Sequence, residues 1–373
     1  MGEEQRVVQT DEEIVASTDI SDIYAAAKRL EGIVRKTPLV YSEYFSDIAG
    51  NATYLKLENL QTTGAFKLRG AYNRISMLTE EERARGVITA SAGNHAQGVA
   101  YASQKLGVSA VICMPATTPI LKVEATRALG STVILHGNGF DDAYAHSLTL
   151  QKEKGYVYIH PFNDRNVIVG QGTIALEVID ALKDVDAILV PVGGGGLASG
   201  IALAVKLVNP QVKVIGVEPE NAACMKAALS CGRTITLPSA DTVADGCAVR
   251  TAGKLTLEFC RRYLDEIITV SEMEIMSALL SLIEKHKFIA EGAGVLSLAA
   301  LNKLRMKGKK IAVLVSGGNI DISTISALIS KALISRGRVF RFSVQLPDKP
   351  GQLLTIAQIL TDQDANVIRL DHD

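Results

Sequence analysis

Between Gly86 and His160, short apolar segments alternate with segments of helical spacing. The apolar segments are VITA (87–90), AVICM (110–114), TVILH (132–136) and YVYIH (156–160), and the helical ones lie near 96–107, 120–129 and 143–154. Short apolar strands joined by helices are typical of a parallel sheet covered on both faces. The pattern therefore predicts an open α/β sheet.

A second series of the same kind follows this one. Its apolar segments are AILVPV (187–192), VKVIGV (212–217), EIITV (266–270) and IAVLV (311–315), with helices expected at 197–208 and after the capping box Ser271-x-x-Glu274. A chain of 373 residues also exceeds the usual size of a single core. We predict a large α/β domain (1–85 and 165–335) with a small α/β domain (86–164) set within it.

Both ends of the chain carry additional elements. After a polar leader, Ser21 is expected to cap a helix that runs through Ile23 to Ile33, ends before Thr37-Pro38 and packs on the larger body. In residues 336–373, FRFSVQL (340–346), a helix near 353–360 and ANVIRL (365–370) predict a β-α-β unit. Such a unit alone cannot cover both faces of its sheet.

Composition excludes several classes of function. A formal net charge of -1 gives no basic surface for nucleic acid. The five cysteines have no paired C-x-x-C spacing, so we expect reduced thiols rather than a zinc site or disulfides. No apolar segment reaches membrane-spanning length, and the acidic leader MGEEQRVVQTDEEIV lacks the basic start of a secretory signal. We expect a cytoplasmic protein.

Three loops follow predicted strands at the edge where open α/β sheets bind ligands. Gly193-Gly194-Gly195-Gly196-Leu197 lies between an apolar strand and an apolar helix, where backbone amides and the helix N-terminus favour a phosphate. The alternative is a flexible linker, which would not stand between two apolar elements. The loop matches neither G-x-x-x-x-G-K-[ST] nor the dinucleotide fingerprint, so nucleoside triphosphates and NAD are disfavoured.

The other two loops are richer in polar side chains. Ser91-Ala92-Gly93-Asn94-His95 opens a helix whose free amides favour an anion such as a carboxylate, although Ser91 could equally be a simple helix cap. Asn94 could hold a phenolic oxygen. In Ser316-Gly317-Gly318-Asn319, the serine could hydrogen-bond to a ring nitrogen; a tight turn is the alternative.

Lys67 follows Phe66 in the segment TGAFKLRG (63–70). An isolated lysine in a helix is most often a solvated surface charge. Together with a phosphate loop and two polar loops, it is a candidate for Schiff-base chemistry, which requires a desolvated amine.

These segments resemble the fold-type II pyridoxal-phosphate (PLP) enzymes, in particular the threonine and serine dehydratases and serine racemase. The resemblance covers about residues 20–335 and rests on AFKLRGA, SAGNHAQG, GQGTIALE, GGGGL, EGAG and SGGN in this order. It implies a tryptophan synthase β-like fold of two open α/β domains with the active site between them. It also implies PLP as the cofactor and a homodimer or homotetramer.

The resemblance further implies roles for individual residues. Lys67 would carry the cofactor and act as the catalytic base, Phe66 would pack on the ring, and Asn94 would hold the ring hydroxyl oxygen. The glycine loop, Gly193 to Leu197, would bind the phosphate, and Ser316 would meet the ring nitrogen. Ser91, Asn94 and His95 would bind the substrate carboxylate. The reaction expected is conversion of L-threonine to 2-oxobutanoate and ammonia, and of L-serine to pyruvate.

Two departures from the common family pattern stand out. Ala65 replaces a serine, which removes one hydroxyl but not the lysine. Ala92 occupies the place of the second acid/base serine of the racemases, and alanine cannot carry a proton. Elimination is therefore favoured over racemisation. A serine racemase, a β-replacement enzyme and a non-catalytic amino-acid sensor remain as alternatives.

The C-terminal segment resembles the first half of an ACT regulatory module, with Asp348-x-Pro350-Gly351 as its turn. An incomplete module predicts lost or weakened feedback control, for example in isoleucine biosynthesis. Relatives bind a metal at positions matching Glu218, the carbonyl of Ala222 and Cys224. Because a thiol is a poor ligand for a hard cation, we expect at most a monovalent ion there.

Overall fold

The computed structural model describes residues 9–371, so the start of the acidic leader lies outside the described residues. The chain divides into two units, residues 1–332 and 333–373. Within the described part, no helix is both long enough and apolar enough to cross a membrane.

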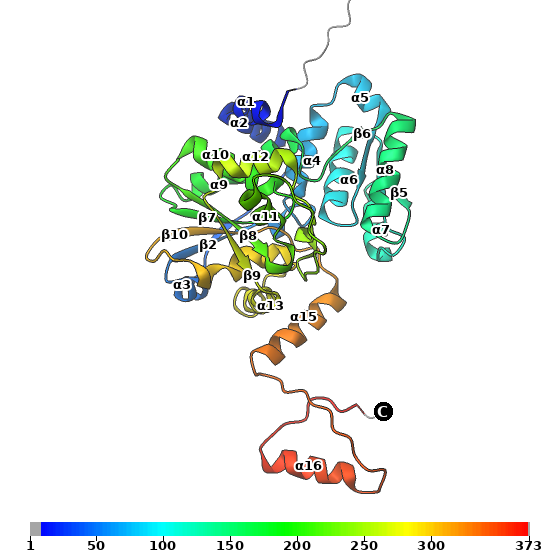
Figure 1. Cartoon of the computed structure of the whole chain (residues 1–373), viewed down its shortest axis with the longest axis vertical. Helices are drawn as coiled ribbons and strands as arrows, with labels where there is room; N and C mark the ends of the chain where they lie inside the picture. The colour runs from blue at the N-terminus through cyan, green and yellow to red at the C-terminus, as the bar shows by residue number, and fades with distance from the viewer. Residues whose placement is uncertain (1–8, 372–373) are drawn as a thin grey trace, which may run out of the picture. The chain divides into compact units, whose positions relative to one another are not determined.

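The larger sheet of the first unit has six strands (Figure 1). In spatial order they are β1 (Leu39–Tyr41), β2 (Ala52–Leu57), β10 (Lys310–Val315), β7 (Ala187–Pro191), β8 (Lys213–Pro219) and β9 (Glu266–Val270). All neighbours are parallel except β1, which pairs antiparallel with β2. The carboxyl ends of the parallel strands therefore share one edge of the sheet.

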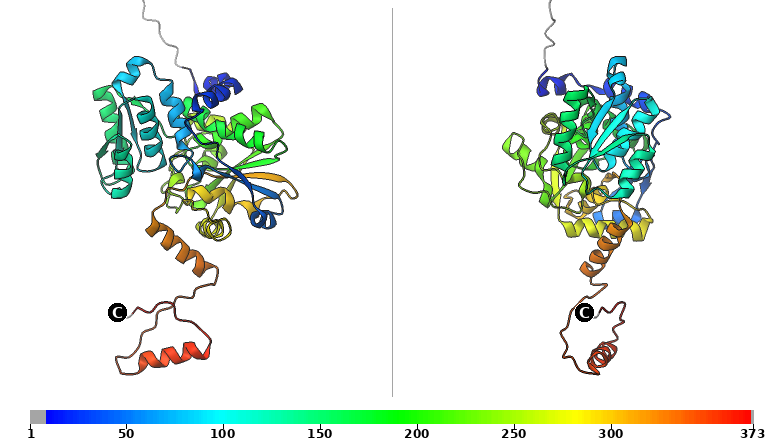
Figure 2. Two further views of the ribbon diagram at one scale, coloured as in Figure 1. Left: turned by 180° about the vertical axis from the view of Figure 1, so that it is seen from behind. Right: turned by 90° about the vertical axis from the view of Figure 1, so that its right-hand side faces the viewer.

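Helices cover both faces of this sheet, as the views in Figures 1 and 2 show. One face carries α9 (Arg165–Ala181), α10 (Gly196–Val208) and α12 (Lys254–Tyr263), with α1 (Asp11–Ser17) and α2 (Ile20–Leu30) packed on them. The other face of the sheet is covered by α13 (Glu272–Ser281) and α14 (Leu296–Ala299). In addition, α3 (Glu43–Ala49) contacts β2, and α11 (Cys224–Cys231) contacts α12. The prediction that the helix through Ile23 packs on the larger body is confirmed by α2, whereas α1 lies in the segment expected to be a polar leader.

The smaller sheet has four parallel strands. Their order is β5 (Thr132–Leu135), β4 (Ala110–Met114), β3 (Val87–Ala90) and β6 (Val157–Tyr158). Along β4, Val111 and Cys113 pack with residues of α8 (Phe140–Lys154), while Ile112 packs with α6 (Asn94–Leu106) and α7 (Ile120–Ala128). This alternation explains why the strand is apolar throughout. The domain division at residues 86 and 164 stays a prediction.

The helix that carries Lys67, α4 (Lys67–Ser76), crosses α9 at glycines. A Cβ at Gly70 would lie 2.4 Å from Nε2 of Gln171, and one at Gly170 would lie 2.7 Å from the carbonyl oxygen of Arg69. Real Cβ contacts are essentially never this short. The GQGTIALE motif is therefore a packing motif that sets the position of α4.

A buried ionic network also holds α4. Arg69 donates both Nε and Nη2 to the carboxylate of Glu58, at 2.9 and 2.8 Å, and Nη1 to Glu177 at 2.6 Å. Lys56 of β2 bonds to the other oxygen of Glu177 at 2.5 Å. Arg69, Glu58 and Lys56 are each at most 2% exposed. The network joins β2, α4 and α9 two residues from Lys67.

Most predicted strands and helices are confirmed, and β3, β4 and β9 have the predicted bounds. The capping box of Ser271 and Glu274 is also present. The predicted cap of the N-terminal helix is wrong. Asp19 caps α2 by accepting from the amide of Ser21, because a carboxylate placed two residues earlier reaches the first free amides. The helix ends at Leu30.

The second unit contains the end of α15 (Ile322–Ser335) and α16 (Gln352–Asp362). The helix predicted near 353–360 is confirmed as α16, but the two predicted strands are wrong, because residues 340–346 and 365–370 form no strand. A strand needs a partner for its amides and carbonyls, and none pairs with these segments among the described residues. Phe340 is accordingly 85% exposed.

The remaining elements are short. They are α5 (Glu80–Arg85), the 3₁₀ turns Glu58–Leu60, Glu220–Ala222, Asp245–Cys247, Ala293–Val295 and Leu301–Lys303, and a π-helical turn at Leu282–His286. The turn at Ala293–Val295 follows Glu291, which enters the site described next.

Candidate active site

Lys67 is the first residue of α4, and its amine points at a backbone carbonyl. Nζ donates to the carbonyl oxygen of Pro161 at 2.8 Å and lies 5.3 Å from the centre of the Phe66 ring. Burial lowers the pKa of Lys67 to about 8, although Cys247 and Glu291 oppose the shift. Near neutral pH, a useful fraction of the amine is therefore unprotonated and nucleophilic.

The Lys67 segment is joined to the loop after β10. The amide of Phe66 donates to the carbonyl of Ser316 at 3.1 Å, and Ala65 and Gly317 form a β-bridge. The Ser316 side chain is 3% exposed, and its hydroxyl makes one long bond, 3.4 Å, to the carbonyl of Ala293. The bridge accounts for a small residue at position 65, since a Cβ at Gly317 would already lie 3.2 Å from that of Ala65.

The glycine loop connects β7 to α10, as predicted. None of the backbone amides of residues 193–198 donates to a protein acceptor in the described part of the chain. Gly195 has φ +97°, a left-handed conformation that favours glycine. The carbonyl of Gly194 is held from outside by Thr256 Oγ1 at 2.6 Å. The loop is thus fixed in position while its amides remain available to an anion.

Residues 160–163, which follow β6, form a strap between Lys67 and the glycine loop. A Cβ at Gly194 would lie 2.4 Å from the Phe162 ring, and one at Gly196 would lie 2.8 Å from its Cα. The strap is fixed at one end by His160, whose Nδ1 accepts from the amide of Asn163 at 2.8 Å. Burial lowers the pKa of His160 to about 4, so this acceptor stays neutral.

The loop after β3 contributes Ser91, Asn94 and His95. The helix cap is Gly93, so the capping alternative for Ser91 is wrong; its hydroxyl instead accepts from the amide of Gly93 at 3.2 Å. His95 is 3% exposed and donates from Nε2 to the carbonyl of Ile159 at 2.9 Å. Burial lowers its pKa to about 3. Its buried Nδ1 has no partner among the described residues.

Asn94 connects this loop to two further residues. Its Nδ2 donates to Oε1 of Glu291 at 2.6 Å, and its Oδ1 accepts from Nδ2 of Asn319 at 2.8 Å. Burial raises the pKa of Glu291 to about 7, against the opposing hydrogen bond from Asn94. Asn94 therefore lies where the loops after β3 and β10 meet.

The residues present fit PLP. A desolvated amine can capture its aldehyde, and the free amides at the N-terminus of α10 can hold its phosphate. The glycines let the loop lie directly against the strap, since Cβ atoms at Gly194 and Gly196 would overlap Phe162. The bare, buried Nδ1 of His95 is a further acceptor without a protein donor.

The predicted cation residues have a structural role in the described chain. The Glu218 carboxylate is fully buried and accepts from the amides of Met225 and Lys226 at 2.8 and 2.9 Å, at the start of α11. Cys224 donates its thiol to the carbonyl of Gly193 at 3.6 Å, and Ala222 is buried. Burial raises the pKa of Glu218 to about 7. No cluster of three or more His, Cys, Asp or Glu residues is found in the described chain.

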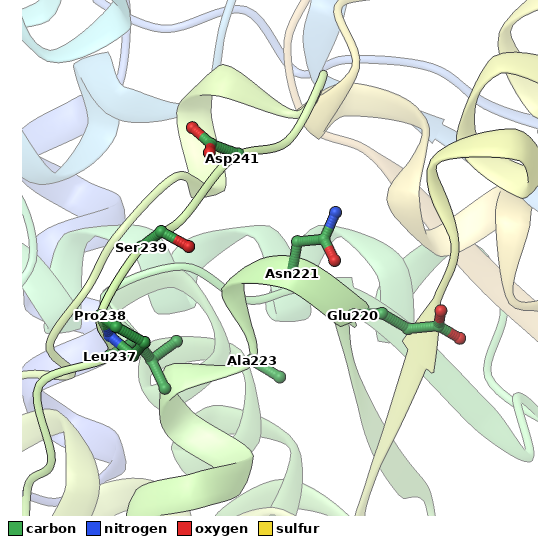
Figure 3. A pocket seen from close by; sticks show the side chains of 7 residues that line it. All are labelled: Glu220, Asn221, Ala223, Leu237, Pro238, Ser239 and Asp241. Carbon is green, nitrogen blue, oxygen red and sulfur yellow. The ribbon is translucent and has the colours of Figure 1, made fainter.

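A surface hollow lies beside the 3₁₀ turn Glu220–Ala222 (Figure 3). It is lined by Glu220, Asn221, Ala223 and residues 237–239 and 241. None of the residues predicted to bind cofactor or substrate lines it, so we assign it no part in the site.

Sequence reasoning missed the strap and the network around Asn94. Phe162 and Pro161 follow a parallel strand, so the positional rule that identified the other loops applied to them as well. Glu291 and Asn319 stand in the EGAG and SGGN segments, but the resemblance assigns neither of these two residues a role of its own. Their distance from Asn94 in sequence, 197 and 225 residues, hides the contact.

A family model described as "Pyridoxal-phosphate dependent enzyme" matches residues 30–317. The L-threonine ammonia-lyase of Thermotoga maritima is 50% identical over 95% of this chain and 88% of its own length. The catabolic L-threonine dehydratase of Escherichia coli is 44% identical over 83% of this chain and 95% of its own.

Solved structures agree in fold. The processed threonine deaminase isoform 2 of Solanum lycopersicum has a TM-score of 0.79 at 40% identity, covering 84% of this chain and 94% of its own. Maize serine racemase has a TM-score of 0.80 at 36% identity, covering 86% and 99%. The predicted fold class and cofactor are thereby confirmed, and the chain belongs to the family of pyridoxal-phosphate dependent enzymes.

Proposed function

We propose that this chain is a PLP-dependent threonine ammonia-lyase that converts L-threonine to 2-oxobutanoate and ammonia, and L-serine to pyruvate. The observation that carries the proposal is its 50% identity, over 95% of the chain, to an L-threonine ammonia-lyase. The geometry supports it, because an amine of lowered pKa stands beside a glycine loop with free amides.

Each part of the site then has a task. When bound, PLP supplies an electron-withdrawing ring that makes the α-proton of the amino acid acidic. The glycine loop, Gly193 to Leu197, holds the phosphate through its amides, and Phe66 packs against the ring. Lys67 holds the cofactor and, once freed, takes the α-proton on Nζ. Because its pKa is about 8, it can serve as a base near neutral pH.

The loop after β3 orients the substrate. The free backbone amides at the start of α6, with Ser91 and the backbone of Asn94, form a site for the carboxylate, and the side-chain amide of Asn94 donates to the ring hydroxyl oxygen. His95 is neutral and buried, so it contributes an acceptor and shape rather than charge. Ser316 meets the ring nitrogen as a neutral hydroxyl. Unlike a carboxylate, it does not strongly favour a protonated nitrogen, which limits electron delocalisation and favours elimination.

Serine racemase is the second candidate, because maize serine racemase shares the fold at 36% identity. Ala92 opposes it. This residue stands in the loop that opens α6 and packs against the buried residues of α6 and β4, with no group that could transfer a proton.

One assay separates the two candidates. The purified chain, saturated with PLP, is given L-threonine or L-serine, and 2-oxo acid and D-serine are both measured. We expect 2-oxo acid from both substrates and no D-serine above background. D-serine as the main product would reject the lyase in favour of the racemase.

We further propose that the enzyme is a cytoplasmic homodimer or homotetramer. All five cysteines are free, and four of them are buried, which suits a reducing compartment. Light scattering on the PLP-saturated chain tests the oligomer, and a monomeric mass would contradict it.

The relatives include enzymes named catabolic and biosynthetic, so a role in isoleucine biosynthesis rests on the keto-acid product alone.

We also propose a monovalent cation near Glu218 and the carbonyl of Ala222. Support comes from the carboxylate itself, which is fully buried and has only amide partners within the described chain. Activity should fall when a bulky organic cation replaces potassium. Equal rates in both salts would contradict the proposal.

A further inference from the structure

The side-chain amide of Asn94 is held at both of its ends. Oδ1 accepts from Nδ2 of Asn319 at 2.8 Å, and Nδ2 donates to Oε1 of Glu291 at 2.6 Å. One N–H of Asn94 is therefore used by Glu291. The second N–H has no protein acceptor among the described residues and is available to a ligand.

The direction of this chain of hydrogen bonds is set by a backbone carbonyl. Nδ2 of Asn319 donates to the carbonyl of Thr63 at 2.7 Å, and a carbonyl oxygen can only accept. The Asn319 atom at this position must therefore be the donor Nδ2, and the Asn94 atom that faces it must be the acceptor Oδ1. A reversed Asn94 amide would place two N–H groups face to face and its oxygen against the carboxylate of Glu291.

Two glycines leave the room that the network needs. A Cβ at Gly317 would lie 2.5 Å from Oε1 of Glu291 and 3.2 Å from Nδ2 of Asn94. A Cβ at Gly64 would lie 2.3 Å from Oδ1 of Asn319, and Gly64 also has φ +71°. Any larger residue at either position would displace a member of the network.

The backbone fixes Glu291 as well. Its amide donates to the carbonyl of Gly317 at 3.1 Å, so the residue is tied to the loop that carries Asn319. The same loop is bridged to Ala65, two residues before Lys67. The network is thus part of the frame that carries the lysine, rather than a flexible surface contact.

We propose that Glu291 and Asn319 are positioning residues, which orient the Asn94 amide so that its second N–H donates to the ring hydroxyl oxygen of PLP. This inference rests on the role given to Asn94 in the proposed function. A donor fixed in this way stabilises the ionised form of a phenolic oxygen. Losing its orientation should change both the absorbance of the bound cofactor and the affinity for it.

The test uses the full chain with PLP. In Asn319→Asp, a carboxylate oxygen replaces the donor nitrogen and faces the carbonyl oxygen of Thr63 and Oδ1 of Asn94, neither of which can donate to it. Glu291→Leu removes the acceptor of the Asn94 N–H. Each should weaken PLP binding about 10-fold, the loss of one hydrogen bond, and shift the visible absorbance band of the bound cofactor. Glu291→Gln can still present an oxygen to Asn94 and should stay within about 3-fold of the wild-type affinity. Gln104→Leu, an exposed change on α6, is the control.

The readouts separate the possible outcomes. Wild-type absorbance and PLP affinity in Asn319→Asp and Glu291→Leu, at an unchanged thermal midpoint, would overturn the inference. Should Glu291→Leu fail to fold, Asn319→Asp and Glu291→Gln carry the test, and equal spectra and affinities in these two would overturn it. A wild-type chain that binds PLP without consuming threonine would reject the proposed function and leave this test intact.

Discussion

Nζ of Lys67 donates to the carbonyl oxygen of Pro161 across 2.8 Å, although 94 residues separate the two in sequence. The contact aims the amine at the strap whose next residue, Phe162, packs on Gly194 and Gly196 of the glycine loop. The Lys67 amine and the glycine loop are therefore both positioned by one short segment. The carbonyl of Pro161 accepts a hydrogen bond from the amine and adds no charge beside it.

The first prediction concerns the pH dependence of cofactor capture. Only the unprotonated amine reacts with an aldehyde, and burial lowers the pKa of Lys67 to about 8. The rate at which the PLP-free chain takes up PLP should rise about tenfold per pH unit below 8 and level off above it. Stopped-flow absorbance between pH 6 and 10 measures this rate. A rate that continues to rise past pH 10 would indicate an ordinary solvated lysine.

The second prediction concerns Ala92. Ala92→Ser restores a hydroxyl in the loop that opens α6, where racemase relatives carry one. We expect measurable D-serine from L-serine in addition to pyruvate, at a low rate because an added acid/base also needs supporting neighbours. Chiral chromatography of the reaction mixture gives the answer. An active variant without D-serine above background would show that Ala92 does not decide between the two reactions.

The third prediction concerns the buried network of Arg69. Arg69→Met leaves the fully buried Glu58 without its bidentate partner and should lower the free energy of unfolding by about 3–5 kcal/mol. Lys36→Met, which breaks the exposed pair with Asp180 at the end of α9, is the matched control and should change nothing measurable. Urea unfolding of both variants makes the comparison. Equal stabilities would show that the network does not hold α4.

The fourth prediction concerns the second unit. In the described chain, residues 340–346 and 365–370 form no sheet, and a control site requires a formed structure that binds its ligand differently in two states of the enzyme. Isoleucine, valine and AMP should therefore change the initial rate little. Saturable inhibition or activation would mean that these segments do form a regulatory site, for example by pairing with those of a neighbouring subunit.

Strands were predictable where an apolar run stood between breaks in the pattern. β3 and β9 have the predicted bounds, because each is a short apolar segment with polar residues or glycine on both sides. β2 was missed, because Lys56 interrupts the run TYLKL. That lysine is 2% exposed and is neutralised by Glu177, which lies 121 residues away. A buried charge paired over such a distance cannot be recognised from local spacing.

The site was predictable to the level of loops rather than of contacts. Position after a parallel strand identified the loops of Asn94, Gly193 and Ser316, and the structure joins them as described. The orientation of Asn94 depends on Glu291 and Asn319, which long-range packing brings to it. In residues 340–346 and 365–370, the local pattern predicted strands, but these segments have no pairing partner in the described chain. β propensity alone does not form a sheet without a neighbouring strand.

The most direct test of the account is to locate the cofactor on the chain. The PLP-saturated protein is reduced with borohydride, digested, and mapped by mass spectrometry for the pyridoxyl label. The account predicts the label on the peptide that contains Lys67, and none in the Lys67→Ala variant at the same thermal stability. A label on another lysine, or no label in PLP-saturated wild-type protein, would contradict the assignment of Lys67 and the site built around it.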